Sequence, residues 1–393
     1  MLTSRIRFDD VHHDDIVYPS AIGFTSVHLA ALGALWSGVT PTAVALCLGL
    51  YFLRMFAITA GFHRYFSHRS FQTSRFFQFV LAFLGQTSLQ QGVLWWSAKH
   101  RHHHRYSDML EDVHSPRHHG FLFAHLGWIF AVRRGQADYD LVKDLSQYPE
   151  LRWLDKHKHL PGVLLGVVCF LVAGWPGLFV GFFLSTVFVY HGAFAINSLA
   201  HVFGRQRYLT GDDSRNNWFL ALITMGEGWH NNHHYYQVAT RQGWRWWEVD
   251  ITYYILKLLS WVGLVWDLKG PPSDVLEGER RLPRRAIEQV AHELAATFPI
   301  ERIAEQVRTT WSQRPSLEEI VATAPKAKAR LESLLRDVSI PHPQLPSVDD
   351  VRRRARSMAP CTPSLEEVAE RAREVVIEAV SARLIAELQP ATA

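Results

Sequence analysis

Apolar residues are concentrated in two pairs of runs within the first 270 residues of the chain. The first pair covers about residues 20–37 and 41–62, and the second pair covers about residues 160–174 and 177–200. These lengths approach the roughly 20 residues that a helix needs to cross the hydrocarbon core of a bilayer. Short breaks that contain glycine and proline separate the two runs of each pair. The pattern therefore predicts four transmembrane helices in two hairpins.

Lysine and arginine are distributed unevenly around these runs. The short breaks inside each pair carry no charge, whereas the segment between the two pairs is rich in both residue types. By the positive-inside rule, the breaks face outward, and all other connections and both termini face the cytoplasm. The polar segment 1–19 is therefore expected to be cytoplasmic, and it lacks the residue order of a cleaved signal peptide.

The apolar segment 76–96 is a candidate for a fifth span. Its interior contains several amides, which a helix exposed to lipid tolerates poorly. A crossing there would also place the histidines before and after it on opposite sides of the membrane. We therefore expect an interfacial or partly buried helix, with a true span and a shifted topology as the alternative. The amides are Gln78, Gln86, Gln90 and Gln91.

The composition changes after Pro272, where the chain becomes charged and rich in alanine. This pattern predicts a membrane domain over residues 20–270 and a helical extension over residues 275–393, whose role the residues do not indicate. The net charge is +4, and no basic patch with interleaved aromatics indicates a nucleic-acid surface. The 3 cysteines include no CxxC pair, which argues against a disulfide framework and against a thiolate metal site.

Histidine is unusually frequent, with 22 in the chain, and three groups of it are dense. An HxxHH spacing places its three imidazoles on one face of a helix, at positions i, i+3 and i+4. Asn197 and His201 form a further i, i+4 pair at the end of the fourth predicted span. This is more imidazole than one zinc ion binds, and it suits two first-row metal ions, with which imidazole is compatible. The groups are His63 and His68, then His100, His103 and His104, and then His230, His233 and His234.

Charged residues around the second group indicate where the histidines lie. Each lysine, arginine or aspartate would cost about 2.5–3.5 kcal/mol near the centre of a bilayer. The metal site is therefore expected in a cytoplasmic helical cap on an all-α membrane domain. Asp108, Asp112 and Glu227 are candidates to accept the second N–H of the ligating imidazoles, although an ordinary surface carboxylate is an equal alternative for each. The remaining histidines are expected to serve in packing or at the interface.

These motifs resemble those of the membrane acyl-CoA desaturase family, the stearoyl-CoA desaturase type and its bacterial delta-9 relatives. Residues 59–69 resemble its first histidine box, residues 100–108 its second, and residues 226–234 its third. Asn197 and His201 resemble an additional ligand pair, in which the asparagine acts through water. The resemblance runs from about residue 20 to about residue 268, and His102 departs from the ligand spacing of the second box.

The resemblance implies a di-iron enzyme that uses O2 to remove hydrogen from two neighbouring methylenes of a saturated acyl chain. The product is a cis double bond, expected at the delta-9 position, and the substrate is an ester of CoA, of acyl carrier protein or of a membrane lipid. The chain has no haem or flavin motif, so a separate electron donor is needed, such as a ferredoxin or a cytochrome b5-like protein with its reductase. The bacterial inner membrane is the expected location.

Some side chains near the second group are candidates for contact with the acyl carbonyl or its head group, with interfacial anchoring as the alternative. A related di-iron hydroxylase, which attacks the same kind of bond, is the nearest alternative enzyme. A metal transporter or a histidine-rich sensor is a third reading, although the predicted spans are nearly bare of polar ligands. The candidate contacts are Gln90, Trp95, Trp96, Arg133 and Arg134.

Overall fold

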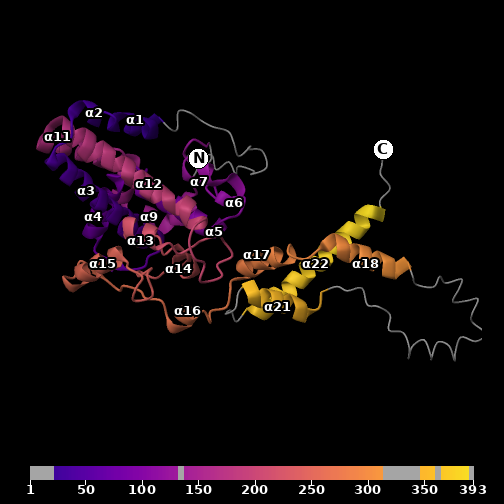
Figure 1. Cartoon of the computed structure of the whole chain (residues 1–393). Helices are drawn as coiled ribbons and strands as arrows, with labels where there is room; N and C mark the ends of the chain where they lie inside the picture. The colour runs from indigo at the N-terminus through magenta and orange to yellow at the C-terminus, as the bar shows by residue number, and fades with distance from the viewer. Residues whose placement is uncertain (1–21, 132–136, 313–345, 359–363, 389–393) are drawn as a thin grey trace, which may run out of the picture. The chain divides into compact units, whose positions relative to one another are not determined.

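The computed structural model describes residues 22–131, 137–312, 346–358 and 364–388 (Figure 1). The chain divides into two compact units, of which the first ends at Leu276 and the second begins at Glu277. The described residues are mostly helical, with one antiparallel pair of short strands, β1 (Gln72–Thr73) and β2 (Val265–Trp266). The predictions for segment 1–19, Arg133 and Arg134 lie outside the described residues.

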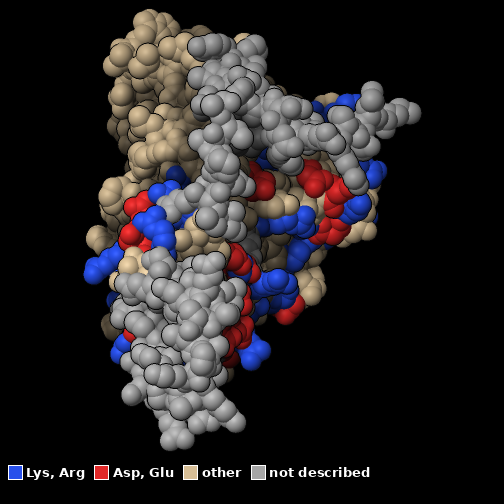
Figure 2. Space-filling model, turned by 90° about the vertical axis from the view of Figure 1, so that its right-hand side faces the viewer, with Lys and Arg blue, Asp and Glu red and all other residues tan. Residues whose placement is uncertain are grey.

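Two stretches of the described residues are long and apolar enough to cross a membrane. They are Pro41–Ser67 and Leu160–His201, and the shorter helical segment Ile22–Ser37 is also apolar. Many large side chains on these stretches are exposed, such as Leu35 at 88% and Leu171 at 76%. In Figure 2, the surface at the upper left that grey atoms leave visible is almost entirely tan, with almost no charged side chain. Large exposed apolar surfaces mark contacts with a membrane or with another protein. The length and apolar character of these helices favour lipid.

The first apolar pair is divided where glycine and proline predicted a break. Helices α1 (Ile22–Ala31) and α2 (Ala34–Ser37) precede Gly38, which has a positive φ of 75°. Thr40 then caps α3 (Pro41–Phe56) by accepting a hydrogen bond from the backbone N–H of Ala43 at 3.2 Å. Proline at the first position of α3 favours this start, because its missing N–H would have had no partner there.

The second apolar pair reverses direction inside one long helical stretch. Helix α11 (Leu160–Pro176) has non-helical torsion angles at Ala173 and Gly174, beside the predicted break. The π-helix η6 (Gly177–Leu184), α12 (Ser185–Ser198) and the 3-10 turn η7 (Leu199–His201) follow. A Cβ atom on Gly166 would contact Phe182 at 3.4 Å, which shows how closely the two arms of the hairpin approach.

Segment 76–96 is two helices rather than the single helix expected from its sequence. Helix α4 (Arg75–Gln86) ends before a turn, and α5 (Val93–Tyr106) begins after it. Gln86 links the helix ends, since its Nε2 donates to the backbone oxygen of Leu154 at 2.9 Å and its Oε1 accepts from Val93 N–H at 3.2 Å. Buried amides with protein partners such as these explain why the apolar pattern was interrupted.

A core shared by α4, α5 and the π-helix η3 (Ala57–Ser67) also contains Val142, Leu151 and Leu256. Short helices and loops complete the first unit. These elements are α6 (Pro116–His119), α7 (Phe121–His125), η4 (Gly127–Ile129), η5 (Tyr139–Val142), α9 (Lys143–Ser146), α10 (Pro149–Lys156), α13 (Trp218–Ile223), α14 (His230–Tyr235), α15 (Ile251–Trp261) and α16 (Ser273–Glu277).

The second unit is a separate group of amphipathic helices with an aliphatic core. Val376 and Val380 of its longest helix pack in this core with Ile303. Helices of this kind bury one apolar stripe and expose charged residues on the other face. The described helices are α17 (Arg284–Ala295), α18 (Ile300–Ser312), α21 (Val348–Met358) and α22 (Leu365–Leu388).

Candidate metal centre

The first histidine pair lies on a π-helix, which explains its unusual spacing. η3 continues directly from α3, and His68 N–H donates to the backbone oxygen of His63 at 3.2 Å, five residues earlier. In a π-helix such i to i+5 bonds place residues five apart one turn from each other. His63 and His68 therefore point to the same side, which an α-helix would not allow at this spacing.

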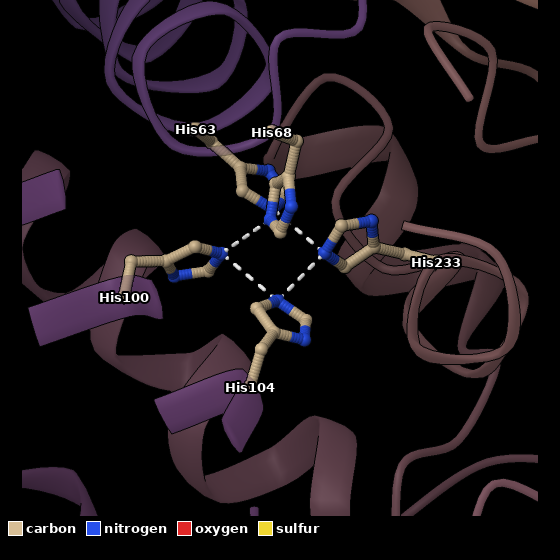
Figure 3. Close-up of side chains that lie close together, drawn as sticks. All are labelled: His63, His68, His100, His104 and His233. Atoms are coloured by element: carbon tan, nitrogen blue, oxygen red, sulfur yellow. Dashed lines mark hydrogen bonds between the residues drawn. The ribbon is translucent and has the colours of Figure 1, made fainter. Parts of the chain in front are cut away.

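Five imidazoles from three helical segments converge on one point (Figure 3). His63 and His68 come from the end of η3, His100 and His104 come from α5, and His233 comes from α14. The Nε2–Nε2 distances are 2.9 Å for His63 and His233, 2.9 Å for His233 and His104, 3.0 Å for His104 and His100, and 2.9 Å for His100 and His68.

The geometry of these nitrogens fits a bound cation better than a hydrogen-bonded ring. An imidazole nitrogen has one in-plane position for a hydrogen or a lone pair. The Nε2 atom of His233 nevertheless lies 2.9 Å from two other Nε2 atoms, so one of these contacts cannot be a hydrogen bond. Two nitrogens that bind one ion at about 2.1 Å and at a right angle lie about 3.0 Å apart. The observed distances match that separation.

A second group of four imidazoles lies beside the first. It contains His103 from α5, His201 from η7, and His230 and His234 from α14. The Nε2 atoms of His201 and His230 lie 3.0 Å apart. The Nε2 atom of His234 is buried and has no hydrogen-bond partner among the described residues. A buried nitrogen of this kind is costly unless a cation or water contacts it.

Carboxylates hold the outer nitrogens of four of these imidazoles. Asp108 lies 2.8 Å from His201 Nδ1, Asp112 lies 3.0 Å from His103 Nδ1, and Glu227 contacts His63 Nδ1. Asp212 lies 2.7 Å from His234 Nδ1 in the same manner. When Nδ1 donates its hydrogen to a carboxylate, the lone pair of Nε2 faces the centre of the group, as a metal ligand requires. Asp212 was missed because nothing in its spacing relates it to a histidine.

Burial and neighbouring charges together shift the pKa of several of these side chains. Burial lowers the pKa of His100, His104 and His233 well below the ordinary value, and neighbouring histidines lower it further. Burial alone would raise the pKa of Asp212, but the charge of His234 and its hydrogen bond lower it well below the usual range. For His100, His104, His233 and Asp212, these directions favour neutral imidazoles and an ionised carboxylate, which are the protonation states that metal binding needs.

A buried arginine, Arg64, forms hydrogen bonds to Glu227. Arg64 Nη2 donates to Glu227 Oε1 at 3.1 Å, and Arg64 Nη1 donates to Asp250 Oδ1 at 2.9 Å and to the backbone oxygen of Thr240 at 2.8 Å. Asp250 is 0% exposed and also caps α15. Arg64 therefore connects His63, through Glu227, to the loop before α15. Arg64 and Asp250 were not predicted from the sequence, because nothing in their spacing distinguishes them from ordinary charged residues.

A second arginine joins the first two histidine groups of the sequence. Arg101 on α5 donates to the backbone oxygens of Phe66 at 2.8 Å and Ser67 at 2.9 Å, which are the last residues before His68. Its guanidinium also donates to Asp144 at 2.7 Å. These bonds tie the end of η3 to the helix that carries His100.

A cavity of about 490 Å³ lies next to both histidine groups. Its volume falls within the range of roughly 300–1,000 Å³ that is typical of ligand sites. His100 and His103 line it, together with Asn197 and with the predicted substrate contacts Gln90, Trp95 and Trp96. Aromatic side chains from α1 and α12 form another part of its wall, namely Phe24, Tyr190 and Phe194.

His114 also lies at this cavity, although we expected it to have only a packing role. Its Nδ1 lies 3.1 Å from Asp112 Oδ1, and its ring centroid lies 4.6 Å from that of His103. Burial lowers the pKa of His114 to about 3, although the charge of Asp112 opposes this shift. A lone histidine outside the HxxHH spacing carried no signal that could have predicted this position.

Comparisons with known proteins agree with the geometry of the site. The sequence profile of the fatty acid desaturase family matches residues 39–264, which is more than half of the chain. The chain is 40% identical to an sn-1 stearoyl-lipid 9-desaturase of Synechocystis over 256 residues, which cover 64% of this chain and 80% of that protein. It is 37% identical to an sn-1 stearoyl-lipid 9-desaturase of Anabaena variabilis over 257 residues, which cover 65% of this chain and 94% of that protein.

An acyl-CoA C20 Delta5-desaturase of Anemone leveillei is 38% identical over 233 residues, which cover 57% of this chain and 73% of that protein. The matched region contains all the histidines of both groups. The chain therefore belongs to the fatty acid desaturase family, as an oxidoreductase that uses O2 to desaturate fatty acyl chains.

Proposed function

We propose that this chain introduces a cis double bond at the delta-9 position of a saturated acyl chain bound in the 490 Å³ cavity. The observation that carries the proposal is the contact between this cavity and two groups of converging, buried imidazoles. The names of the Synechocystis and Anabaena relatives support the delta-9 position.

Two iron ions are the proposed cofactor. The first group, His63, His68, His100, His104 and His233, would hold one ion. The second group, His103, His201, His230 and His234, would hold the other, with Asn197 acting through water. Imidazole is compatible with iron, and the family implies a di-iron centre. When bound, the irons would supply the O2 chemistry that removes one hydrogen from each of two neighbouring methylenes.

The protein's own part in this reaction is to hold ligands and substrate in fixed positions. Asp108, Asp112, Asp212 and Glu227 keep the imidazole lone pairs directed inward. An alkyl chain offers no polar handle along its length, so the shape of the cavity must place the reacting carbons. Trp96 stacks on His100 with 4.9 Å between ring centroids, and it thereby forms a wall between cavity and histidines. Gln90 and Trp95 are proposed to contact the acyl ester end.

For the membrane arrangement we propose four spans in two hairpins, with the metal centre in a cytoplasmic helical cap at a bacterial inner membrane. The apolar stretches, the reversal at Ala173 and Gly174, and the charges around the second histidine group support this arrangement. In the same proposal, residues 20–270 form the desaturase domain and residues 275–393 form an extension of unassigned role.

The reaction needs two electrons from outside the chain. A ferredoxin, or a cytochrome b5-like protein with its reductase, is the proposed donor. The acyl carrier is proposed to be a membrane lipid, because two of the relatives are named as acyl-lipid desaturases. Acyl-CoA and acyl carrier protein are the alternative carriers.

The test is fatty-acid profiling of a host that lacks delta-9 desaturation and expresses the protein, with and without an added electron donor. New delta-9 alkenes in membrane lipids, and about two irons per purified chain, are the expected results. Hydroxy fatty acids without new alkenes would replace the proposal with a hydroxylase. Zinc alone, with no consumption of oxygen, would favour a non-enzymatic metal protein.

A further inference from the structure

Three histidines outside both metal-binding groups form a continuous chain of contacts between α1, α12 and α7. His28 Nε2 lies 3.2 Å from His191 Nε2, and His191 Nδ1 lies 3.1 Å from His125 Nε2. The contacts end at Ser198, whose Oγ lies 2.8 Å from His125 Nδ1. We call His28, His191 and His125 the histidine chain. From the sequence, these three residues were expected to have only a packing or interfacial role.

The contact at one end determines the position of every hydrogen in the neutral form. His28 Nδ1 lies 2.9 Å from the backbone oxygen of Phe24, so this nitrogen must carry a hydrogen. His28 Nε2 is then an acceptor, and His191 Nε2 must donate to it. His191 Nδ1 in turn accepts from His125 Nε2, and His125 Nδ1 accepts from the hydroxyl of Ser198. All contacts are satisfied in this arrangement.

The same contacts can hold one additional proton. Ser198 Oγ also lies 3.1 Å from the backbone oxygen of Phe194, toward which its hydroxyl can turn. His125 Nδ1 can then bind a proton, and the new N–H donates to Ser198 Oγ. Transfer along the two N–H···N contacts moves the positive charge to His191 and then to His28. Every contact still contains one hydrogen, so no hydrogen bond is lost.

The surroundings favour a proton that is bound weakly. Phe24 and Tyr190 contact His28, and Phe194 contacts His125. Tyr190 is the titratable side chain among these contacts, and its hydroxyl donates to the backbone oxygen of Leu89. Burial lowers the pKa of His125, while the backbone oxygen of Phe194 opposes this shift. A weakly held proton can be released to a neighbouring acceptor.

Desaturation consumes protons, because R–CH2–CH2–R, O2, two electrons and two protons give R–CH=CH–R and two waters. We propose that the histidine chain stores one of these protons and releases it through His125 and Ser198 toward the cavity. Ser198 is followed by the turn to His201, and its neighbour Asn197 lines the cavity together with Phe194. The histidine chain touches no reacting atom, so it acts through groups or water in the cavity. This inference rests on the proposed function.

Glutamine at position 125 separates proton storage from structural support. In His125→Gln, the side-chain amide can donate to His191 Nδ1 and accept from Ser198, which keeps the neutral contacts. It cannot take up a proton. We expect kcat to fall by roughly tenfold or more, since acid–base groups contribute about 10²–10⁴ to rates. We also expect an unchanged KM, a larger solvent deuterium isotope effect on kcat, and wild-type iron content.

A second readout does not depend on turnover. Solid-state ¹⁵N NMR of histidine-labelled wild-type protein in lipid, recorded while the pH is lowered, should show that His28, His125 and His191 together take up one proton; three separate protonations would overturn the proposal. His157→Gln is the matched control, because His157 lies at the exposed end of α10 outside the histidine chain, and it should leave kcat and the isotope effect unchanged. Wild-type kcat and an unchanged isotope effect in His125→Gln would overturn the proposal.

His191→Gln is a second variant that tests the proposal if His125→Gln fails to fold. It leaves His125 as a proton acceptor but stops the transfer of charge to His28. A lower kcat with an altered pH profile is expected, and a pH profile identical to that of the wild type would overturn the proposal. A wild-type protein that forms no double bonds would instead contradict the proposed function, so the two failures are distinguishable.

Discussion

The substitution Asp212→Asn tests the second histidine group without removing a ligand. Asp212 Oδ2 accepts from His234 Nδ1 at 2.7 Å, while its Oδ1 accepts from Thr210 Oγ1 at 2.7 Å and from Ser214 N–H at 3.1 Å. An asparagine that keeps the Oδ1 bonds must direct its NH2 group at His234 Nδ1. That contact moves the imidazole hydrogen to Nε2, which then has no lone pair for metal.

The size of the effect follows from this change of tautomer. Loss of a group that orients a ligand costs about 10- to 100-fold in metal affinity. This factor corresponds to about 1.4–2.7 kcal/mol for the second ion. If the asparagine instead turns its oxygen toward His234, Thr210 and Ser214 lose their acceptor, and unfolding becomes easier by about 1–3 kcal/mol. One of these two losses is unavoidable.

The assay is iron content during competition with a chelator of graded concentration, combined with double-bond yield. Asp212→Asn should lose one of two irons at a chelator concentration about 10- to 100-fold lower than the wild type, while the other iron stays bound. Asp213→Asn is the matched control, because Asp213 pairs with Arg117 near the surface at 2.7 Å. If Asp212→Asn retains both irons as firmly as the wild type and has an unchanged unfolding temperature, the reasoning about His234 is refuted.

Three further outcomes are expected. Arg101→Gln should lower the free energy of unfolding by about 1–3 kcal/mol, because the backbone oxygens of Phe66 and Ser67 lose their side-chain donor; an unchanged thermal midpoint would contradict this. Ala193→Phe should shift the products toward shorter acyl chains, because residue 193 lines the cavity; an unchanged chain-length profile by gas chromatography would contradict this. The metal-free protein should lose stability as the pH falls below about 6.5, because the lowered pKa of His100 and His104 lets the unfolded state bind more protons; a thermal midpoint that is constant from pH 7.5 to pH 5.5 would refute it.

The breaks between the apolar runs were predictable because they depend on local chemistry. Gly38 needs a positive φ, and Pro41 fits only the first turn of a helix, so both mark a boundary in any context. Segment 76–96 was not predictable in the same way. Where α4 ends, Gln86 donates to the backbone oxygen of Leu154, a residue distant in sequence. Hydrophobic periodicity contains no information on such a contact.

In the candidate site too, features set by local sequence were predictable, and features set by the packing of distant segments were not. The HxxHH spacing predicted that all three imidazoles of each group share one helix face. His100 and His104 do lie in one group, and so do His230 and His234, but His103 and His233 each face the other group. The division of the imidazoles into two groups was not visible, because it depends on how η3, α5 and α14 pack. Asp212 was missed for the same reason, since a loop brings it to His234 and no spacing rule covers that loop.

Helices α5 and α14 each divide neighbouring histidines between the two groups. His103 and His104 are consecutive in α5 but face different groups, and His233 and His234 do the same in α14. The spacing between the two groups is therefore set by the backbones of α5 and α14 rather than by rotation of side chains. If each group binds one ion, as proposed, the distance between the ions would change when either helix bends. A kink introduced into α5 or α14 would thus be expected to lower the rate of desaturation, although all the histidines would still be present.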